Sequence, residues 1–207
     1  MSGKKSPVAT KTRRDSYHHG DLKRALTSAA LSLVAERGPK GFTLTEAARR
    51  AGVSAAAPYR HFTDKAHLLA TVAEQGFVDL HAALTAGADA ASGPTDRLIA
   101  IGRVYVRWAV GHSDQYRVMF GADTDKTQHP SLAVAAGQAF GNLLEAIAGC
   151  QAAGLLGGEE PLKVAGPLWS LVHGIASLAI EGELRNVGID RDPEDMVSDA
   201  LAVLLDR

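Results

Sequence analysis

One short stretch, residues 43–62, constrains the fold more than any other part of this 207-residue chain. It opens with TLTE, residues 43–46, a capping box in which the threonine and glutamate side chains satisfy each other's free backbone N–H groups at the start of a helix. Gly52 can take the left-handed conformation that ends a helix, and Ser54 is a good N-cap for the next one. The pattern therefore predicts two short helices joined by a turn, the second over residues 55–62.

A longer helix precedes this pair. Apolar residues recur at steps of three and four from Asp21 onward, and the pattern ends near Arg37 and Gly38, a basic last turn followed by a helix stop. Two short helices joined by a glycine-containing turn and braced by a longer helix form a helix-turn-helix. Helical periodicity continues through the rest of the chain. We therefore predict an all-α protein, in which an N-terminal three-helix helix-turn-helix domain precedes a larger helical domain.

The net charge of −1 conceals a division of charge along the chain. Residues 1–65 hold 13 lysines and arginines against 5 acidic residues, whereas residues 66–207 hold 9 against 18. Such asymmetry indicates that the basic end meets an anion such as nucleic acid, while the acidic remainder stays solvated. Combined with the helix-turn-helix pattern, it favours DNA binding.

In a helix-turn-helix the second helix lies in the major groove, with its first residues against the base edges. Small side chains allow the backbone to approach closely, and alanine methyl groups can contact a thymine methyl. Side chains that can donate to a phosphate or a base follow, and these are Tyr59, Arg60, His61 and Lys65. Phe62 is expected to turn inward and to anchor the helix to its own domain. Helical spacing alone leaves a second interpretation open, in which Tyr59, His61 and Phe62 are core aromatics of a small helical bundle.

Two segments carry a resemblance to a known family. YHHGDLKRALTSAALSLVAERG and GFTLTEAARRAGVSAAAPYRHFTDKAHLLATV resemble the N-terminal DNA-binding domain of the TetR family of transcriptional regulators, over about residues 17 to 77. The resemblance implies phosphate contacts from Thr43, Tyr59, His61 and Lys65. It implies base-facing positions at Ala55, Ala56, Ala57 and Arg60. Pro58 departs from the aliphatic residue that many members carry there, and since proline removes one backbone hydrogen bond, we expect a shifted or tightened helix start.

The resemblance and the loop signals together predict the domain organisation. Residues 1–16 are predicted to be a disordered basic arm, and residues 17–66 the helix-turn-helix DNA-binding domain. Residues 67–85 are predicted to form a linking helix. A helical effector-binding and dimerisation domain is expected over residues 86–207, and the Gly, Ser and Pro of AGADAASGPTD, residues 86–96, mark its start.

The segment LWSLVHG, residues 168–174, is similar to a subgroup of TetR-like proteins whose C-terminal domain carries a Trp and His-Gly signature. It lies in a helix predicted over residues 162–184, and a last helix is predicted over 192–206. The resemblance makes these two the dimerisation helices, which pair with their mates as a four-helix bundle. The residues predicted at this interface are Gly166, Ser170, Gly174, Ser177, Met196, Ala200 and Val203.

The resemblance also implies that the acidic half senses a ligand, and that this effector changes the separation of the two recognition helices and so releases DNA. Aromatic side chains with a few polar ends line apolar ligand sites. The candidates for such a pocket are Tyr105, Trp108, His112, Tyr116, Phe120, Phe140, Trp169 and His173. Each of them can instead be an ordinary core residue.

An enzymatic function finds no support, because the sequence contains no GxSxG, HExxH or P-loop motif, and we predict neither catalysis nor a cofactor. His18 and His19 have no Cys or carboxylate neighbours at ligand spacing, so no metal site is expected. The single cysteine, Cys150, suits a reducing cytoplasm. No apolar run approaches the roughly 18 to 20 residues that span a bilayer, and no secretory signal is seen, so we expect a cytoplasmic protein without a membrane partner.

The predicted function is therefore that of a sequence-specific DNA-binding transcriptional regulator. We expect a repressor that binds a palindromic, double-stranded operator as a homodimer, because two-fold dimers read symmetric half-sites. An unidentified small-molecule effector would release it. Two alternatives remain: an architectural DNA binder without an effector, and a helical small-molecule carrier with a vestigial helix-turn-helix.

Overall fold

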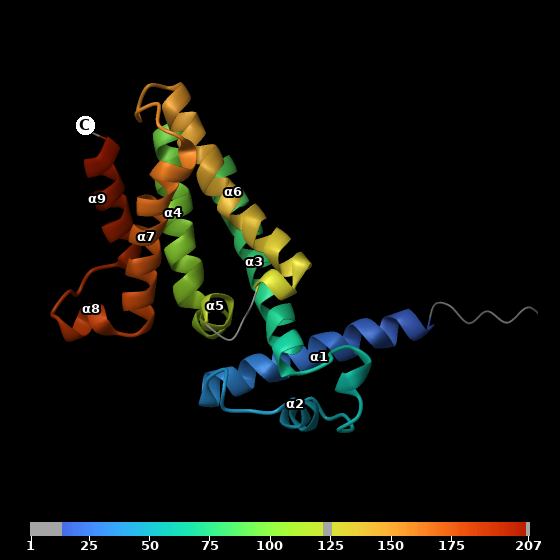
Figure 1. Cartoon of the computed structure of the whole chain (residues 1–207). Helices are drawn as coiled ribbons and strands as arrows, with labels where there is room; N and C mark the ends of the chain where they lie inside the picture. Colours follow the sequence, from blue (N-terminus) through green and yellow to red (C-terminus); the bar gives the residue numbers. More distant parts are fainter. Residues whose placement is uncertain (1–13, 122–125, 206–207) are drawn as a thin grey trace, which may run out of the picture. The chain divides into compact units, whose positions relative to one another are not determined.

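The computed structural model describes residues 14–121 and 126–205, with side chains from residue 21 onward. Every regular element in these ranges is helical (Figure 1), so the predicted all-α fold class is confirmed. The chain forms two compact units, Met1–Leu69 and Ala70–Arg207. Residues 14–16 of the predicted disordered arm already belong to the first helix, and the rest of that arm lies outside the described residues, as do the side chains of His18 and His19.

The smaller unit is a helix-turn-helix built from three elements and the start of a fourth. These are α1 (Arg14–Arg37), α2 (Leu44–Arg50), the 3-10 turn η1 (Pro58–Arg60) and the first residues of α3 (Lys65–Asp89). Its largest fully buried side chains are Leu26, Leu33, Phe62, Leu68 and Leu69. Phe62 therefore turns inward, as the sequence predicted.

Both ends of α2 form as predicted. Thr43 Oγ1 accepts a hydrogen bond from the backbone N–H of Glu46 at 3.2 Å, and the Glu46 carboxylate accepts one from the Thr43 N–H at 2.8 Å. At the other end Gly52 has a φ of 72°, and the N–H groups of Gly52 and Val53 donate to the carbonyls of Arg49 and Ala48. This pair of bonds is a Schellman motif, which satisfies carbonyls that the helix end leaves free.

The helix predicted over residues 55–62 is wrong, because only Pro58–Arg60 are helical and they form a 3-10 turn. The N–H of Ala57 donates to the Ser54 carbonyl at 3.0 Å, and the N–H of Arg60 donates to the Ala57 carbonyl at 3.3 Å. In an α-helix that begins at residue 55, residue 58 would donate the first bond, to Ser54. Proline has no N–H to donate, so the chain takes the tighter three-residue pattern.

The larger unit contains the rest of α3 and all later elements. They are α4 (Pro94–Gly111), α5 (Ser113–Phe120), η2 (Lys126–Gln128), α6 (Pro130–Ala152), α7 (Pro161–Ile180), α8 (Glu183–Asn186) and α9 (Pro193–Leu205). Helix α4 packs against α6, α7 and α9, and α7 also packs against α6 and α9 (Figure 1). The core of this unit therefore lies around α4.

Two boundaries differ from those read in the sequence. The helix expected over residues 162–184 ends at Ile180, because Gly182 takes a left-handed φ of 76° and the short α8 follows. The two units divide after Leu69, inside α3, close to the end predicted for the helix-turn-helix domain at residue 66, whereas the larger domain was expected to start only at the loop of residues 86–96. That loop is short because α3 extends to Asp89.

Helix α9 approaches α4 closely at Gly102. A methyl group added at Gly102 would lie 2.8 Å from Val197 Cγ1 and 3.1 Å from Leu201 Cδ1. Because Val197 and Leu201 are almost fully buried, neither has room to move aside. Only the smallest side chain permits this helix contact.

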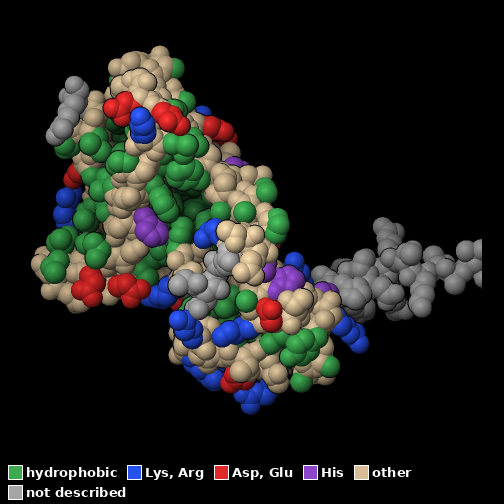
Figure 2. Space-filling view, viewed as in Figure 1, with side chains coloured by type: hydrophobic (Ala, Val, Ile, Leu, Met, Phe, Trp, Pro, Cys, Tyr) green, Lys and Arg blue, Asp and Glu red, His purple; other side chains and the backbone are tan. Residues whose placement is uncertain are grey.

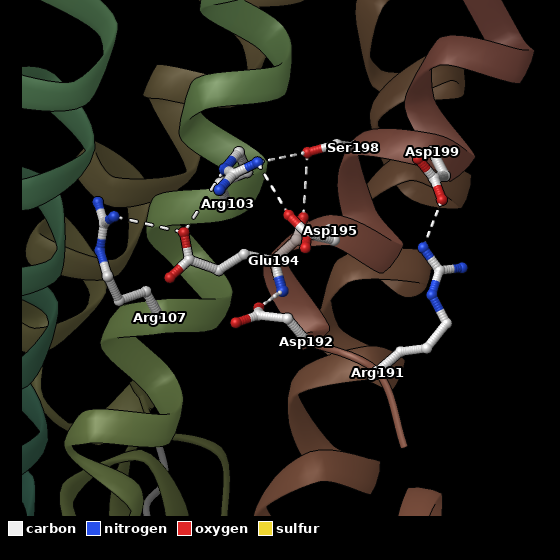
Figure 3. Close-up of polar contacts among 8 residues, drawn as sticks. All are labelled: Arg103, Arg107, Arg191, Asp192, Glu194, Asp195, Ser198 and Asp199. Atoms are coloured by element: carbon white, nitrogen blue, oxygen red, sulfur yellow. Dashed lines mark hydrogen bonds and ion pairs between the residues drawn. The ribbon is translucent and has the colours of Figure 1, made fainter. Parts of the chain in front are cut away.

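Ion pairs and hydrogen bonds also join α4 to α9 (Figure 3). Arg103 of α4 lies 3.5 Å from the carboxylate of Glu194 and 3.3 Å from that of Asp195, and Arg107 lies 3.3 Å from Glu194. The Arg103 guanidinium also donates to Ser198 Oγ at 3.1 Å. A single surface ion pair contributes little to stability, but several charges that share partners can form a network that contributes more. The network of Arg103, Arg107, Glu194 and Asp195 joins α4 to α9 and so holds the position of α9 along α4.

Helices α6 and α7 are long and apolar enough to cross a membrane by length and composition alone, which the sequence analysis did not anticipate. Each contains an 18-residue window of mean hydropathy 1.2. In this structure, however, Leu132 and Ile147 of α6 and Ile175 of α7 are buried in the core of the larger unit. A core helix of a globular protein satisfies the same criterion, so this property assigns neither helix to a membrane.

Gly102→Ala tests the close approach of α4 and α9. We expect its free energy of unfolding to be about 1–3 kcal/mol below that of Gly137→Ala, since overpacking a core costs that much. Gly137 on α6 is the matched control, because a methyl group added there meets no described atom within 4 Å, while both changes gain the same helix propensity. Chemical denaturation measures both values, and equal stabilities would contradict the proposed contact.

Candidate DNA-binding surface and ligand pocket

Residues 55–61, hereafter the reading segment, carry most of the predicted DNA contacts. Its exposed residues are Ala55, Ala56, Tyr59 and Arg60. Tyr59 is 60% exposed, which is unusual for an aromatic residue and argues against the core interpretation of this side chain. Ala57 and His61 are half-buried. Most of the predicted contact positions are therefore accessible to a partner.

Two buried residues attach the reading segment to its unit. Pro58 is buried within the segment, and Phe62, which follows it, is only 1% exposed. The Phe62 ring meets the His67 ring edge-to-face, with centroids 5.6 Å apart. The reading segment lacks the continuous backbone hydrogen bonds of a regular recognition helix, and the burial of Pro58 and Phe62 holds it against the unit instead.

Thr43 and Lys65, the other two predicted phosphate contacts, have partners inside the unit. The Thr43 hydroxyl and N–H both donate to the Glu46 carboxylate, at 3.1 and 2.8 Å. The Lys65 ammonium donates to the Pro39 carbonyl at 3.2 Å and lies 5.2 Å from the centre of the Phe42 ring. An ammonium has three donors, so Lys65 can still face a phosphate, whereas the Thr43 hydroxyl must exchange its partner first.

Basic side chains spread over the viewed face of the smaller unit (Figure 2). Some of this charge is paired: Arg50 contacts both carboxylate oxygens of Glu36, at 2.6 and 2.7 Å, and Arg37 lies 3.0 Å from Glu46. The hydrogen bond from Arg50 lowers the pKa of Glu36. The positive potential of this unit must therefore come mainly from its other lysines and arginines, which include Arg49 and Arg60, both exposed.

The larger unit contains a cavity of about 320 Å³. Its lining residues come from α3, α4, α5, η2, α6, α7 and α9, and they are Phe77, Leu80, Leu84, Leu98, Ile101, Gly102, Tyr105, Phe120, Lys126, Ala136, Ala139, Phe140, Leu143, Leu168, Trp169, Val172 and Leu201. Figure 2 shows hydrophobic side chains gathered over α4, α6 and α7 on the viewed face. Ligand pockets have volumes of roughly 300–1,000 Å³, so this cavity suits a small molecule.

Four of the eight predicted pocket residues line this cavity, namely Tyr105, Phe120, Phe140 and Trp169. Trp108 and His112 do not; they stack on each other, with ring centroids 4.7 Å apart, and His112 Nδ1 lies 2.9 Å from the Trp108 carbonyl oxygen. The positions of Tyr105, Trp108 and His112 in the sequence do not show which of them faces the cavity. Helix α4 is covered on several sides by other helices, so a buried residue on it need not line the cavity.

The remaining two predicted residues, Tyr116 and His173, form a polar cluster with Tyr105 at the cavity wall. His173 Nδ1 lies 2.7 Å from the Tyr116 hydroxyl and 2.9 Å from the Tyr105 hydroxyl, and the two hydroxyls are 3.3 Å apart. Burial lowers the pKa of His173 and raises the pKa of both tyrosines. The cluster is therefore a neutral hydrogen-bonded network rather than a set of charges.

Sequence reasoning missed several cavity residues. Phe77, Leu80 and Leu84 were assigned to a linking helix, yet they line the cavity. Lys126 lies in the polar segment GADTDKTQHP, residues 121–130, and nothing in its neighbourhood along the chain marks it as a pocket residue. Its Nζ lies over the rings of Phe77 and Phe120, at 5.5 and 5.8 Å from their centres, and only the folded structure brings it there.

The residues predicted at a dimer interface lie on α7 and α9. Gly166, Ser170 and Val203 are exposed, with Val203 at 60%, and the half-buried members are Gly174, Ser177, Met196 and Ala200. Methyl groups added at Gly166 and Gly174 would meet no described atom within 4 Å, so nothing in the described part of the chain covers these glycines. Exposed apolar residues also occur on the same helices, and they are Leu162, Leu178 and Leu204.

Comparison with protein families gives two matches along the chain. "Bacterial regulatory proteins, tetR family" matches residues 26–72, and "Tetracyclin repressor-like, C-terminal domain" matches residues 98–204, which is half of the chain. The chain belongs to the TetR family. The second match does not test whether the chain belongs to the Trp and His-Gly subgroup, so that finer assignment stays a prediction. The matched family is one of bacterial regulatory proteins and the curated relative is a transcriptional regulator, so this TetR-family chain is a regulator rather than an enzyme.

Solved structures support the assignment of the fold. A protein of unknown function from a Rhodococcus species is 32% identical and has a TM-score of 0.79, and the match covers 92% of this chain and 96% of that one. The TetR-family transcriptional regulator PfmR from Thermus thermophilus is 16% identical with a TM-score of 0.68, covering 88% of this chain and 97% of that one. At that identity the second likeness shows the fold alone.

A curated relative matches part of the TetR-family chain. The HTH-type transcriptional regulator BetI of Agrobacterium fabrum is 37% identical over 94 residues, which is 45% of this chain and 43% of the relative. The match thus spans less than half the length of that regulator.

Two substitutions test the reading segment. Tyr59→Phe removes a hydroxyl from an exposed ring and is expected to weaken binding to all DNA by about 0.5–1.5 kcal/mol, without changing the salt dependence. Lys65→Ala is expected to lower the slope of log affinity against log salt by about 1, since it removes one phosphate-facing charge. Fluorescence anisotropy over a salt series measures both. Unchanged binding to random DNA in both variants would show that these side chains do not face phosphates.

Burial of His173 predicts a pH dependence of stability. The folded state holds the pKa of His173 below its ordinary value of 6.5, so the unfolded state takes up this proton first as the pH falls. The free energy of unfolding should therefore fall as the pH drops through about 6.5. His173→Gln should show a smaller loss between pH 7.5 and pH 5.5 in denaturation experiments. An identical loss in both proteins would assign the effect to other groups.

Proposed function

We propose that this protein is a sequence-specific transcriptional repressor that acts in the cytoplasm and is released from its operator by a small molecule. The observation that carries the proposal is the pairing of two features in one TetR-family chain. One is an exposed reading segment anchored on a helix-turn-helix, and the other is an apolar cavity in a different unit. An architectural DNA binder needs no such cavity, and a carrier needs no such exposed segment.

We further propose that the protein binds DNA as a homodimer through α7 and α9. Exposed apolar side chains beside uncovered glycines support this role, because small residues let two helices approach closely and the neighbouring apolar area gains from burial. Half-sites of a two-fold operator would then lie one or more helical turns apart. The Trp and His-Gly signature of the subgroup is part of the same proposal: Trp169 faces the cavity, and the small residues of the same helix face the partner.

The proposed function is tested by binding of the full chain to its own upstream DNA and to random DNA of equal length. We expect a preference of about a thousandfold for a two-fold symmetric site, within the usual range for specific regulators. Fluorescence anisotropy at several salt concentrations gives both affinities. Equal affinity for all sequences, including the upstream region of every neighbouring gene, would favour an architectural role, and absence of DNA binding near physiological salt would favour a carrier.

A further inference from the structure

The chemistry of the cavity wall restricts what the cavity can hold. Almost all of its lining residues are apolar, and among the described lining residues Lys126 is the one charged side chain. No carboxylate occurs among them. A cationic ligand would therefore bring its charge into an apolar space beside a lysine and without a counter-ion among the described lining residues, which is unfavourable. The wall favours ligands that are neutral or negatively charged.

Lys126 itself provides an incomplete site for an anion. Its ammonium donates to the Met119 carbonyl at 3.1 Å and lies near the faces of Phe77 and Phe120. An ammonium has three donors, and one of them is used by this carbonyl. Burial lowers the pKa of Lys126, and no neighbouring acid among the described residues offsets this effect. A ligand anion would supply a counter-charge that the described residues around Lys126 do not provide.

A second polar group also lies beside the Phe120 ring. That ring is 4.7 Å from both Tyr116 and His173, centre to centre, and these side chains hold the Tyr105 hydroxyl at the cavity wall. The polar groups of the cavity are thus gathered around Phe120, whereas Leu84, Leu98 and Leu143 make an apolar wall. A ligand that matches this distribution has one polar head and an apolar body.

We propose that the cavity binds an apolar molecule with a single carboxylate, whose carboxylate pairs with the Lys126 ammonium and whose body fills the Leu- and Phe-lined space. The volume of about 320 Å³ is roughly twice that of a cavity that holds one benzene ring, so the ligand is small. The role of this ligand as effector rests on the proposed function, but its binding does not.

The test uses three probes with the same ten-carbon chain and different heads: decanoate, decanol and decylamine. Isothermal titration calorimetry with the full chain, below the aggregation threshold of each probe, measures the affinities. We expect decanoate to bind at least tenfold more tightly than decanol, and decylamine to bind more weakly than both. Equal affinities for decanoate and decanol in the unmodified protein would overturn the proposal without any variant having to fold.

Two variants of Lys126 and one control variant locate the head group. Lys126→Met should reduce the affinity for decanoate about tenfold or more and leave the affinity for decanol within about twofold. Lys163→Met is the matched control, because Lys163 is exposed on α7 and does not line the cavity, and it should change neither. A decanoate affinity that survives Lys126→Met would overturn the assignment. Lys126→Arg keeps the charge and should retain the preference for decanoate over decanol.

A further arm separates this inference from the proposed function. Decanoate is added to the complex of the protein with its preferred DNA, and anisotropy follows release. Release that requires Lys126 would support the effector role. Tight, Lys126-dependent binding without release would uphold the cavity assignment and contradict the effector role, whereas DNA binding without any decanoate affinity would overturn the cavity assignment alone.

Discussion

The larger unit depends on the close contact between α4 and α9 at Gly102. Because that position has no side chain, Val197 and Leu201 can pack directly on α4, and the ion pairs of Arg103 and Arg107 fix where along α4 they do so. The same stretch of α4 faces the cavity through Ile101 and Tyr105. Since Leu201 lines the cavity as well, a change in the position of α9 changes the cavity wall. One helix contact therefore links the ligand space to a proposed dimerisation helix.

The sequence predicted those features that depend on neighbours along the chain. The capping box at Thr43, the left-handed Gly52 and the inward Phe62 each follow from a few consecutive residues, and the structure contains all three. The same local reasoning explains the error over residues 55–62. The pattern of residues 55–62 predicts a helix, but Pro58 lacks the N–H group that would donate the first hydrogen bond of that helix. Backbone hydrogen bonding decided the outcome there.

The cavity was less predictable, because its wall combines residues from seven elements. Aromatic character identified Tyr105, Phe120, Phe140 and Trp169, but it also identified Trp108 and His112, which stack on each other away from the cavity. Lys126 could not be found from the sequence, since a lysine in a polar loop is ordinarily solvated. Only the folded structure places Lys126 of η2 over two aromatic rings.

The attachment of the reading segment through Pro58 and Phe62 has an evolutionary consequence. These two side chains point into the core, whereas Ala55, Ala56, Tyr59 and Arg60 are exposed. Substitutions at exposed sites usually change stability by less than about 0.5 kcal/mol. The residues proposed to face DNA can thus be exchanged almost independently of the residues that hold the fold. A lineage of such proteins can acquire new target sequences in a few steps without passing through unstable intermediates.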